Sequence, residues 1–159
     1  MSVDARLTQI GVKLLKNSSP IGNFTYVPTR RTGNLVYVSG QLPRVEKNGS
    51  LGLMEGKVGM NVELTEAQQA ARLCGISILS VLADAIGSLD RVSAVVKVEG
   101  FVNATDSFTD HPLVINGCSD LFVEVFGKEI GSHARAAVGC SSLPKGVPVE
   151  VAAVFEIRD

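Results

Sequence analysis

The apolar pattern of residues 65–89 constrains the fold more than any other stretch. Small or apolar side chains recur there every three or four positions, the spacing of one face of an α-helix: Ala67, Ala71, Cys74, Ile78, Val81, Leu82, Ala85 and Leu89. Thr65 and Gln68 fit a capping box at its start, and Gly87 suits its end. We expect Gly75 to let this helix lie close on a sheet.

A second helical pattern runs from about residue 112 to residue 126. Pro112 is well placed at a first helical position, and Gly127 is expected to end the helix. Its apolar stripe consists of Ile115, Cys118, Leu121, Phe122 and Val125. Residues 5–16 show a weaker pattern that fits a short helix or a helix running into a strand.

The remaining regular segments read as β-strands, because β-branched residues alternate with others between turn signals. A hairpin is expected from an extended segment at 24–29, a turn at 32–34 and a strand at 35–41, followed by further strands at 91–102, 132–140 and 149–157. Residues 44–60 are rich in glycine and polar groups and are expected to form a long loop. The order β-β-α-β-α-β-β predicts an α+β fold, with two helices covering one face of a single sheet.

The last two strands should each present one face to the helices. In that assignment Ala134, Ala136, Val138 and Cys140 face the helices, together with Val149, Val151, Ala153, Phe155 and Ile157. The opposite face would carry His133, Arg135, Ala137, Glu150, Ala152 and Val154. That face is partly apolar with no helix left to cover it, so we expect another subunit to cover it.

Bulk composition fits a single domain over residues 1–159 and narrows the class of protein. Hydrophobic residues make up 45% and the mean hydropathy is +0.25, which is high for a soluble monomer. No apolar run approaches the roughly 18 residues that span a bilayer, so no membrane association is expected. No signal-peptide pattern opens the chain, and its three cysteines form no CxxC pair. A cytoplasmic protein with reduced thiols is predicted.

Charge argues against a nucleic-acid partner. The net charge is −1, there is no tryptophan, and aromatic residues make up only 5%. Nucleic-acid binding normally needs clustered basic residues, and base stacking needs aromatic ones. No glycine-rich phosphate loop is present, and the two histidines and three cysteines lack metal-ligand spacing. No metal site is therefore predicted.

Arg135 and Glu150 are the candidate functional residues. Each is a charged group set among alternating apolar residues of a predicted strand, and charges are rarely buried without a partner. The pair fits a ligand site, in which the arginine forks onto a carboxylate and the glutamate activates water. It equally fits a structural ion pair or two exposed residues. His133 could join the network or be a solvated histidine at a strand end.

Ser39-Gly40 is a second candidate feature, at the end of the strand 35–41. Glycine permits close approach of a ligand or a neighbouring backbone, and here it would expose backbone N–H groups. A glycine bulge explains the same residues equally well.

Several motifs of this sequence resemble the YjgF/RidA family, whose best-known members are enamine/imine deaminases. They are residues 31–43 (Arg-Thr-Gly-Asn-Leu-Val-Tyr-Val-Ser-Gly-Gln-Leu-Pro), 87–92 (Gly-Ser-Leu-Asp-Arg-Val), 135–139 (Arg-Ala-Ala-Val-Gly), Leu143-Pro144 and 149–151 (Val-Glu-Val). They occur in the family order from about Ser19 onward. Residues 108–112 (Phe-Thr-Asp-His-Pro) with Asn116-Gly117 and His133 are similar to a longer, less characterised branch.

The resemblance implies a chorismate-mutase-like fold, in which a mixed β-sheet packs on two helices and three subunits form a barrel-like homotrimer. It implies ligand clefts between subunits. It also implies cofactor-free hydrolysis of reactive intermediates such as 2-aminoacrylate to a 2-keto acid and ammonia. The expected ligand is thus a small carboxylate-bearing 2-imino or 2-keto acid.

The resemblance also assigns roles to individual residues. Arg135 matches the arginine that holds the substrate carboxylate, and Glu150 matches the glutamate beside the attacking water. Ser39 and Gly40 match the backbone of the cleft. Two substrate-binding positions differ from many members, because Ala137 stands at a usual cysteine and Phe24 at a usual tyrosine.

Three functions follow as hypotheses. The first is an enamine/imine deaminase. The second is a protein that binds or senses a small carboxylate without turnover, which Phe24 and Ala137 favour relative to a typical member. The third, described for some family members, is a ribonuclease or translation inhibitor, against which the mild acidity counts.

Overall fold

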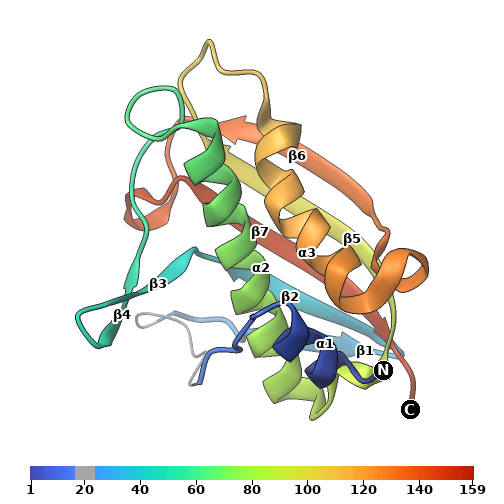
Figure 1. Cartoon of the computed structure of the whole chain (residues 1–159). Helices are drawn as coiled ribbons and strands as arrows, with labels where there is room; N and C mark the ends of the chain where they lie inside the picture. The colour runs from blue at the N-terminus through green and yellow to red at the C-terminus, as the bar shows by residue number, and fades with distance from the viewer. Residues whose placement is uncertain (17–23) are drawn as a thin grey trace.

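The computed structural model describes residues 1–16 and 24–159. Its main feature is a five-stranded mixed sheet in the order β1-β2-β7-β5-β6 (Figure 1). The β5 and β6 strands are parallel, and the other neighbours are antiparallel. The strands are β1 (Thr29–Thr32), β2 (Leu35–Gln41), β5 (Val92–Asn103), β6 (Ala134–Cys140) and β7 (Val149–Ile157). The predicted α+β class is confirmed.

Two long helices, α2 (Leu64–Ile86) and α3 (His111–Gly131), lie side by side on one face of this sheet, as predicted (Figure 1). The short α1 (Val3–Gln9) contacts α3. The core between the layers includes an edge-on contact between Phe122 of α3 and Phe155 of β7, with ring centroids 5.5 Å apart. Burial raises the pKa of the Cys74 and Cys118 thiols, so both stay protonated at neutral pH.

The start of α2 differs from the capping box expected at Thr65 and Gln68. The helix begins at Leu64, and the backbone N–H of Glu63 donates to the carboxylate of Glu66 at 2.9 Å. The box is therefore shifted by two residues. A glutamate serves in it because a carboxylate accepts hydrogen bonds from free N–H groups at a helix start.

Gly75 and Gly117 set the distance between the two helices. A methyl group at Gly75 would meet Leu121 and Cys118 of α3, and one at Gly117 would overlap the backbone of Gln68 in α2. The expectation that Gly75 faces the sheet is wrong, because this glycine lies on the side of α2 that faces α3. The regular part of α3 ends at Gly127, as predicted, because its φ of 79° breaks the helical geometry, and a second helical segment then runs to Gly131.

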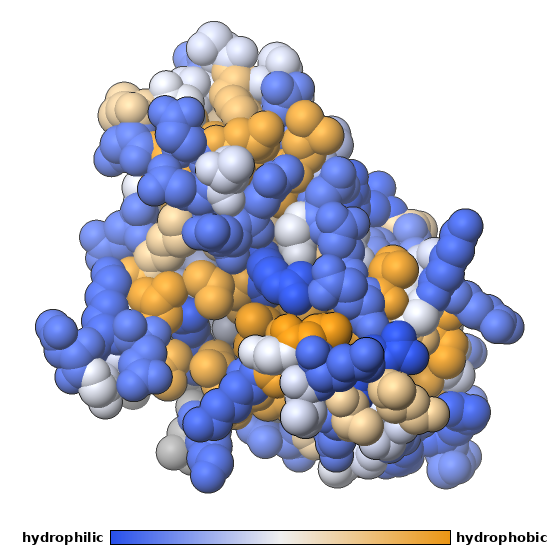
Figure 2. Space-filling model, viewed as in Figure 1, coloured by the Kyte–Doolittle hydropathy of each residue, from blue (hydrophilic) through white to orange (hydrophobic). Residues whose placement is uncertain are grey.

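The helical layer faces the viewer in Figure 2 and is mostly hydrophilic, with scattered apolar areas. By length and composition α2 could cross a membrane, but 61% of its apolar window is buried inside the protein. This is the behaviour of a core helix, since its apolar side is covered by sheet and helix.

The predicted loop 44–60 contains a hairpin of its own, formed by β3 (Arg44–Lys47) and β4 (Ser50–Leu53). Its turn residues Asn48 and Gly49 have φ values of 52° and 77°. An Asn-Gly turn with positive φ at both residues is a strong hairpin signal, which the glycine-rich composition obscured.

Bulges interrupt the alternation of side chains along β5. Register shifts between Val92 and Ala94 and between Val95 and Lys97 change which side chains point inward. As a result Val95 is buried against the helices, whereas Val96 is exposed on the opposite face. A bulge inserts one residue into a strand and so reverses a simple period of two.

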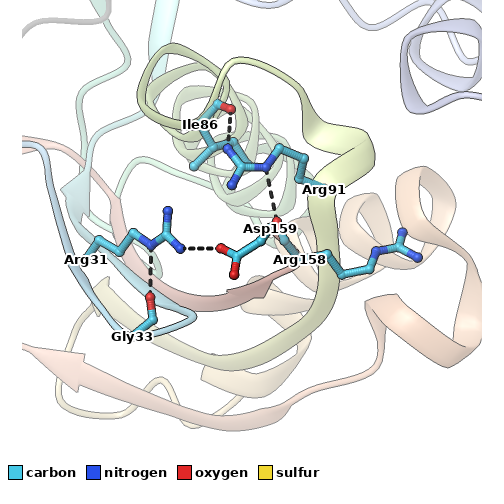
Figure 3. Close-up of polar contacts among 6 residues, drawn as sticks. All are labelled: Arg31, Gly33, Ile86, Arg91, Arg158 and Asp159. Carbon is cyan, nitrogen blue, oxygen red and sulfur yellow. Dashed lines mark hydrogen bonds and ion pairs between the residues drawn. The ribbon is translucent and has the colours of Figure 1, made fainter.

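Arginines hold the C-terminal end of β7 in place (Figure 3). Arg31 forms a salt bridge with Asp159 at 2.9 Å and donates to the Gly33 carbonyl. Arg91, in the single-turn η1 (Leu89–Arg91), donates to the carbonyls of Ile86 and Arg158. These contacts join the β1–β2 turn, the end of α2 and the chain end.

Candidate functional site

A cavity of about 370 Å³ opens where the end of β2, the start of β3 and the start of β7 meet. The turn η2 (Pro144–Gly146) borders it. Its lining residues are Phe24, Tyr26, Ser39, Gly40, Gln41, Leu42, Arg44, Pro144, Lys145 and Glu150. Four of the predicted site residues thus come together: Phe24, Ser39, Gly40 and Glu150.

Gly40 lies directly against the Glu150 side chain. A methyl group at Gly40 would overlap Glu150 Oε1 and stand 3.0 Å from its Cδ. The pairing of β2 with β7 shifts between Val38 and Gln41, so Gly40 sits in a bulge. The glycine bulge is confirmed, and the group that approaches Gly40 is the Glu150 side chain. The close approach of a ligand stays a prediction.

Glu150 is half-buried at this position. Burial raises the pKa of its carboxyl group above the ordinary value, and no salt bridge to it occurs within the described residues. Glu150 therefore holds a proton more tightly than an exposed glutamate does.

Ser39 is engaged within its own chain. Its hydroxyl donates to the Val27 carbonyl at 2.7 Å, and its backbone N–H donates to the Pro28 carbonyl at 2.9 Å. The expectation that the Ser39 N–H is exposed for a ligand is wrong, because the segment before β1 already takes that hydrogen bond.

Tyr26 is a pocket residue that the sequence analysis missed. Its ring lies 5.6 Å from that of Phe24, and both line the cavity. A phenol hydroxyl is thus present in the pocket although position 24 lacks one. A tyrosine two positions after Phe24 was the available signal.

Two cations of the pocket were also missed, Arg44 and Lys145. Arg44 is only 9% exposed, and burial lowers its pKa from the usual value. Lys145 adopts a φ of 60° in the left-handed region, a conformation that strains a residue with a side chain and is often found at functional sites. Both lie in segments without strong periodicity, where alternation offers no guidance.

Arg135 lies elsewhere. Its guanidinium donates to Asn116 Oδ1 at 2.7 Å, to Ser119 Oγ at 3.1 Å and to the Pro112 carbonyl at 3.2 Å, all on α3. Its strand partner is Val98, which is fully buried against the helices. Arg135 and Glu150 therefore point to opposite faces of the sheet within one chain.

The side chains of His133 and Ala137 point to the same side of the sheet as that of Arg135. The His133 ring is within hydrogen-bond distance of Ser119 Oγ at 2.9 Å and of the Gly131 carbonyl at 2.7 Å. Burial lowers its pKa, so the ring is neutral at pH 7. Ala137 packs against the core. His133 thus belongs to the Arg135 network on the helix side.

The expected orientation of β6 was therefore wrong. His133, Arg135 and Ala137 face α3, while Ala134, Ala136 and Val138 are exposed on the other side. Alanine occurs on both faces of this strand, so alternation gives little indication of its orientation. The parallel register with β5 decides it.

No helix among the described residues covers the opposite face of the sheet. Tyr37, Val96 and Val138 are 46%, 38% and 48% exposed there. Glu150, Ala152 and Val154 of β7 lie on this face, as predicted, and are half-buried. The face also carries a salt bridge between Lys97 and Glu99 at 3.1 Å.

The mixed sheet with two helices on one face defines a chorismate-mutase-like α+β domain. Its pocket contains the Glu150 carboxyl group and is large enough for a small molecule. The family model described as "YjgF/chorismate_mutase-like, putative endoribonuclease" matches residues 4–152. The chain belongs to the YjgF/RidA family.

The chain is 45% identical to protein TCP17 of Trypanosoma cruzi, covering 99% of this chain and 95% of that protein. A structure of Atu1372 from Agrobacterium tumefaciens, of unknown function, is 41% identical with a TM-score of 0.84, over 99% of this chain and 94% of that one. A "putative endoribonuclease" from Shewanella oneidensis MR-1 is 30% identical with a TM-score of 0.89, covering 99% of this chain and all of that one.

Two further solved structures have lower TM-scores. RidA from Psychrobacter sp. PAMC 21119 is 25% identical with a TM-score of 0.57, over 91% of this chain and 98% of that one. TdcF from E. coli, crystallised with bound serine, is 23% identical with a TM-score of 0.58, over 92% and 98%.

Proposed function

We propose that this protein hydrolyses reactive enamine and imine intermediates of small 2-keto acids, such as 2-aminoacrylate, to the 2-keto acid and ammonia. The observation that carries the proposal is the half-buried Glu150 carboxyl, with its raised pKa, held against Gly40 in a pocket. Family membership and a RidA of the same fold support it.

In the proposed reaction the enamine is first protonated at carbon and becomes the imine. Glu150 then takes a proton from water as the water oxygen bonds to the imine carbon. The same carboxyl group returns that proton to nitrogen, which gives a carbinolamine. It then takes the proton of the new hydroxyl and passes it to nitrogen as well, so the C–N bond breaks, ammonia leaves and the C=O bond of the keto acid forms. A carboxyl group with a pKa raised toward neutrality suits these proton transfers.

We propose that Arg135 of a neighbouring copy completes the pocket by binding the substrate carboxylate. Within one chain Arg135 and Glu150 point to opposite faces, so a shared site requires a second subunit. Arg135 lies on the edge strand β6, and its contact with the Pro112 carbonyl is exposed to solvent. The uncovered, partly apolar sheet face favours self-association, for which we propose a homotrimer in the cytoplasm.

The proposal is tested by adding the purified protein to a pyridoxal-phosphate lyase that releases 2-aminoacrylate. Pyruvate and ammonia should appear faster with the wild type and with the control variant Arg31→Gln. Glu150→Gln should abolish the acceleration. Arg135→Ala should lower kcat/KM. If Arg135 binds the carboxylate in a desolvated cleft, the loss corresponds to about 2–5 kcal/mol of transition-state stabilisation. No acceleration by micromolar wild-type protein would refute the proposal.

A carboxylate-binding protein without turnover is the second candidate, because Phe24 and Ala137 replace residues common in deaminases. A relative named "Putative regulator AldR" from Lactococcus lactis is 28% identical over 133 residues. Calorimetry with 2-ketobutyrate and serine distinguishes the two candidates, since this one predicts saturable binding with no ammonia release. An RNA-cleavage assay on nuclease-free protein tests the endoribonuclease activity that the family description names.

A further inference from the structure

Arg44 is unusual among the charged residues of this protein. In the part of the chain that the structure describes, it is the only charged residue in the buried class, with 9% of its surface exposed. Removing a guanidinium from water costs several kcal/mol unless polar or anionic groups surround it. A buried arginine that lines an open cavity can bind an anion there, because its guanidinium carries several N–H donors.

The position of Arg44 in the pocket suits this role. It is the first residue of β3, whereas Glu150 lies near the start of β7, and both line the same cavity. Tyr26 lines the same cavity and brings a phenol hydroxyl to it. Lys145 adds a second positive charge to the lining from η2. The pocket therefore holds two cations from its own chain, in addition to the acid and base Glu150.

The cavity also exceeds the needs of the smallest substrates. Its volume of about 370 Å³ lies within the range of about 300–1,000 Å³ that holds drug-sized ligands. A three-carbon imino acid would leave much of this space to water. A longer acid could fill it and extend its far end to a second cation.

We propose that Arg44 forms an anion subsite that selects 2-imino and 2-keto acids carrying a second carboxylate. The inference rests on the proposed function for the identity of the reacting group. The first carboxylate is then held as described above, and the second is bound by the guanidinium fork of Arg44, which matches a carboxylate in two parallel hydrogen bonds. Lys145 adds a second positive charge to the lining of the cavity.

The test is calorimetric binding of 2-oxoglutarate and 2-oxobutyrate to the intact protein. These acids share the 2-keto carboxylate and differ in the second one. The wild type should bind 2-oxoglutarate about tenfold or more tightly, the effect expected of one charge-assisted pair. Arg44→Gln should remove this preference and leave 2-oxobutyrate affinity within about threefold. Arg44→Lys should keep part of the preference, since the charge remains without the planar fork.

Arg31→Gln is the matched control, because Arg31 forms an exposed salt bridge with Asp159 at the chain end (Figure 3). It should bind both acids like the wild type. Equal affinity of the wild type for the two acids would overturn the inference, even if Arg44→Gln failed to fold. If Arg44→Gln lost affinity for both acids equally, the inference would also be overturned, since Arg44 would then bind the carboxylate that the two acids share.

The two proposals fail separately. If the protein shows no deaminase activity, its binding preference for a dicarboxylate can still be measured. Conversely, turnover of 2-aminoacrylate with no dicarboxylate preference would refute the role of Arg44 alone.

Discussion

Substituting Gly40 by alanine should separate stability from activity. The added methyl group would overlap Glu150 Oε1, which is the end of a flexible side chain rather than backbone. To restore ordinary contact at about 3.5–4.0 Å, the carboxylate has to move by about 1 Å or more. The strand itself has no reason to move.

The two effects on the free energy of unfolding nearly cancel. Replacing a strand glycine by alanine stabilises the folded state by about 0.5–1 kcal/mol. Displacing Glu150 from its preferred rotamer destabilises the folded state by about 0.5–1.5 kcal/mol. A net change of 1 kcal/mol shifts Tm by only about 2–4 °C in a domain of this size. Misplacing a reacting group by about 1 Å, in contrast, can reduce the rate about 100-fold.

The measurements are Tm, kcat/KM for 2-aminoacrylate hydrolysis, and the pKa of Glu150 from a carboxyl ¹³C titration. Gly40→Ala should keep Tm within a few degrees, lose about two orders of magnitude in kcat/KM, and move the pKa of Glu150 toward its ordinary value. Gly52→Ala is the matched control, because its methyl group would meet only the Lys47 side chain at 3.1 Å, outside the pocket. A Gly40→Ala variant with wild-type kcat/KM and an unchanged Glu150 pKa would show that this reasoning is wrong.

Four further predictions follow from burial and packing. Glu150→Gln should stabilise the protein above the folded pKa of Glu150, because burial makes the folded state hold this proton more tightly than the unfolded chain; the gain should vanish below about pH 4 in thermal melts. His133 has a lowered pKa, so its contribution should destabilise the fold as pH falls below about 6.5, and His133→Asn should flatten that part of the stability–pH curve. Gly117→Ala should destabilise by about 1–3 kcal/mol in urea unfolding, since the overlap with the α2 backbone outweighs a helix-propensity gain of about 1 kcal/mol; an unchanged midpoint would contradict the close helix packing. Val138→Asp on the uncovered face should convert an assembly of about three times 16.8 kDa to single chains in light scattering, and a wild type that already runs as a monomer would rule out the proposed trimer.

Most of the secondary structure was predictable because it depends on local periodicity. The strand 149–157 and the two helices have strong one-sided patterns, and both helices and the strand lie where expected. The errors occurred where the signal was weak or interrupted. Bulges in β5 reversed its alternation, and the Asn48-Gly49 turn was hidden in a glycine-rich segment.

The candidate site was only partly predictable for the same reason. Gly40 and Glu150 were expected to matter, and the structure places them in contact. Arg44 and Tyr26 carry no periodic signal, and only folding brings them into the pocket. The site role of Arg135 stays a prediction that requires a second subunit.

By itself, the sequence determined the α+β class, the helical faces and the family, because these follow from side-chain periodicity and ordered motifs along the chain. Only the tertiary structure decided that Arg135 turns toward α3 while Glu150 turns away from the helices. The physical reason is that a strand rich in alanine on both sides has no strong preference for either face. Its orientation comes from pairing with β5, whose buried Val98 aligns with Arg135.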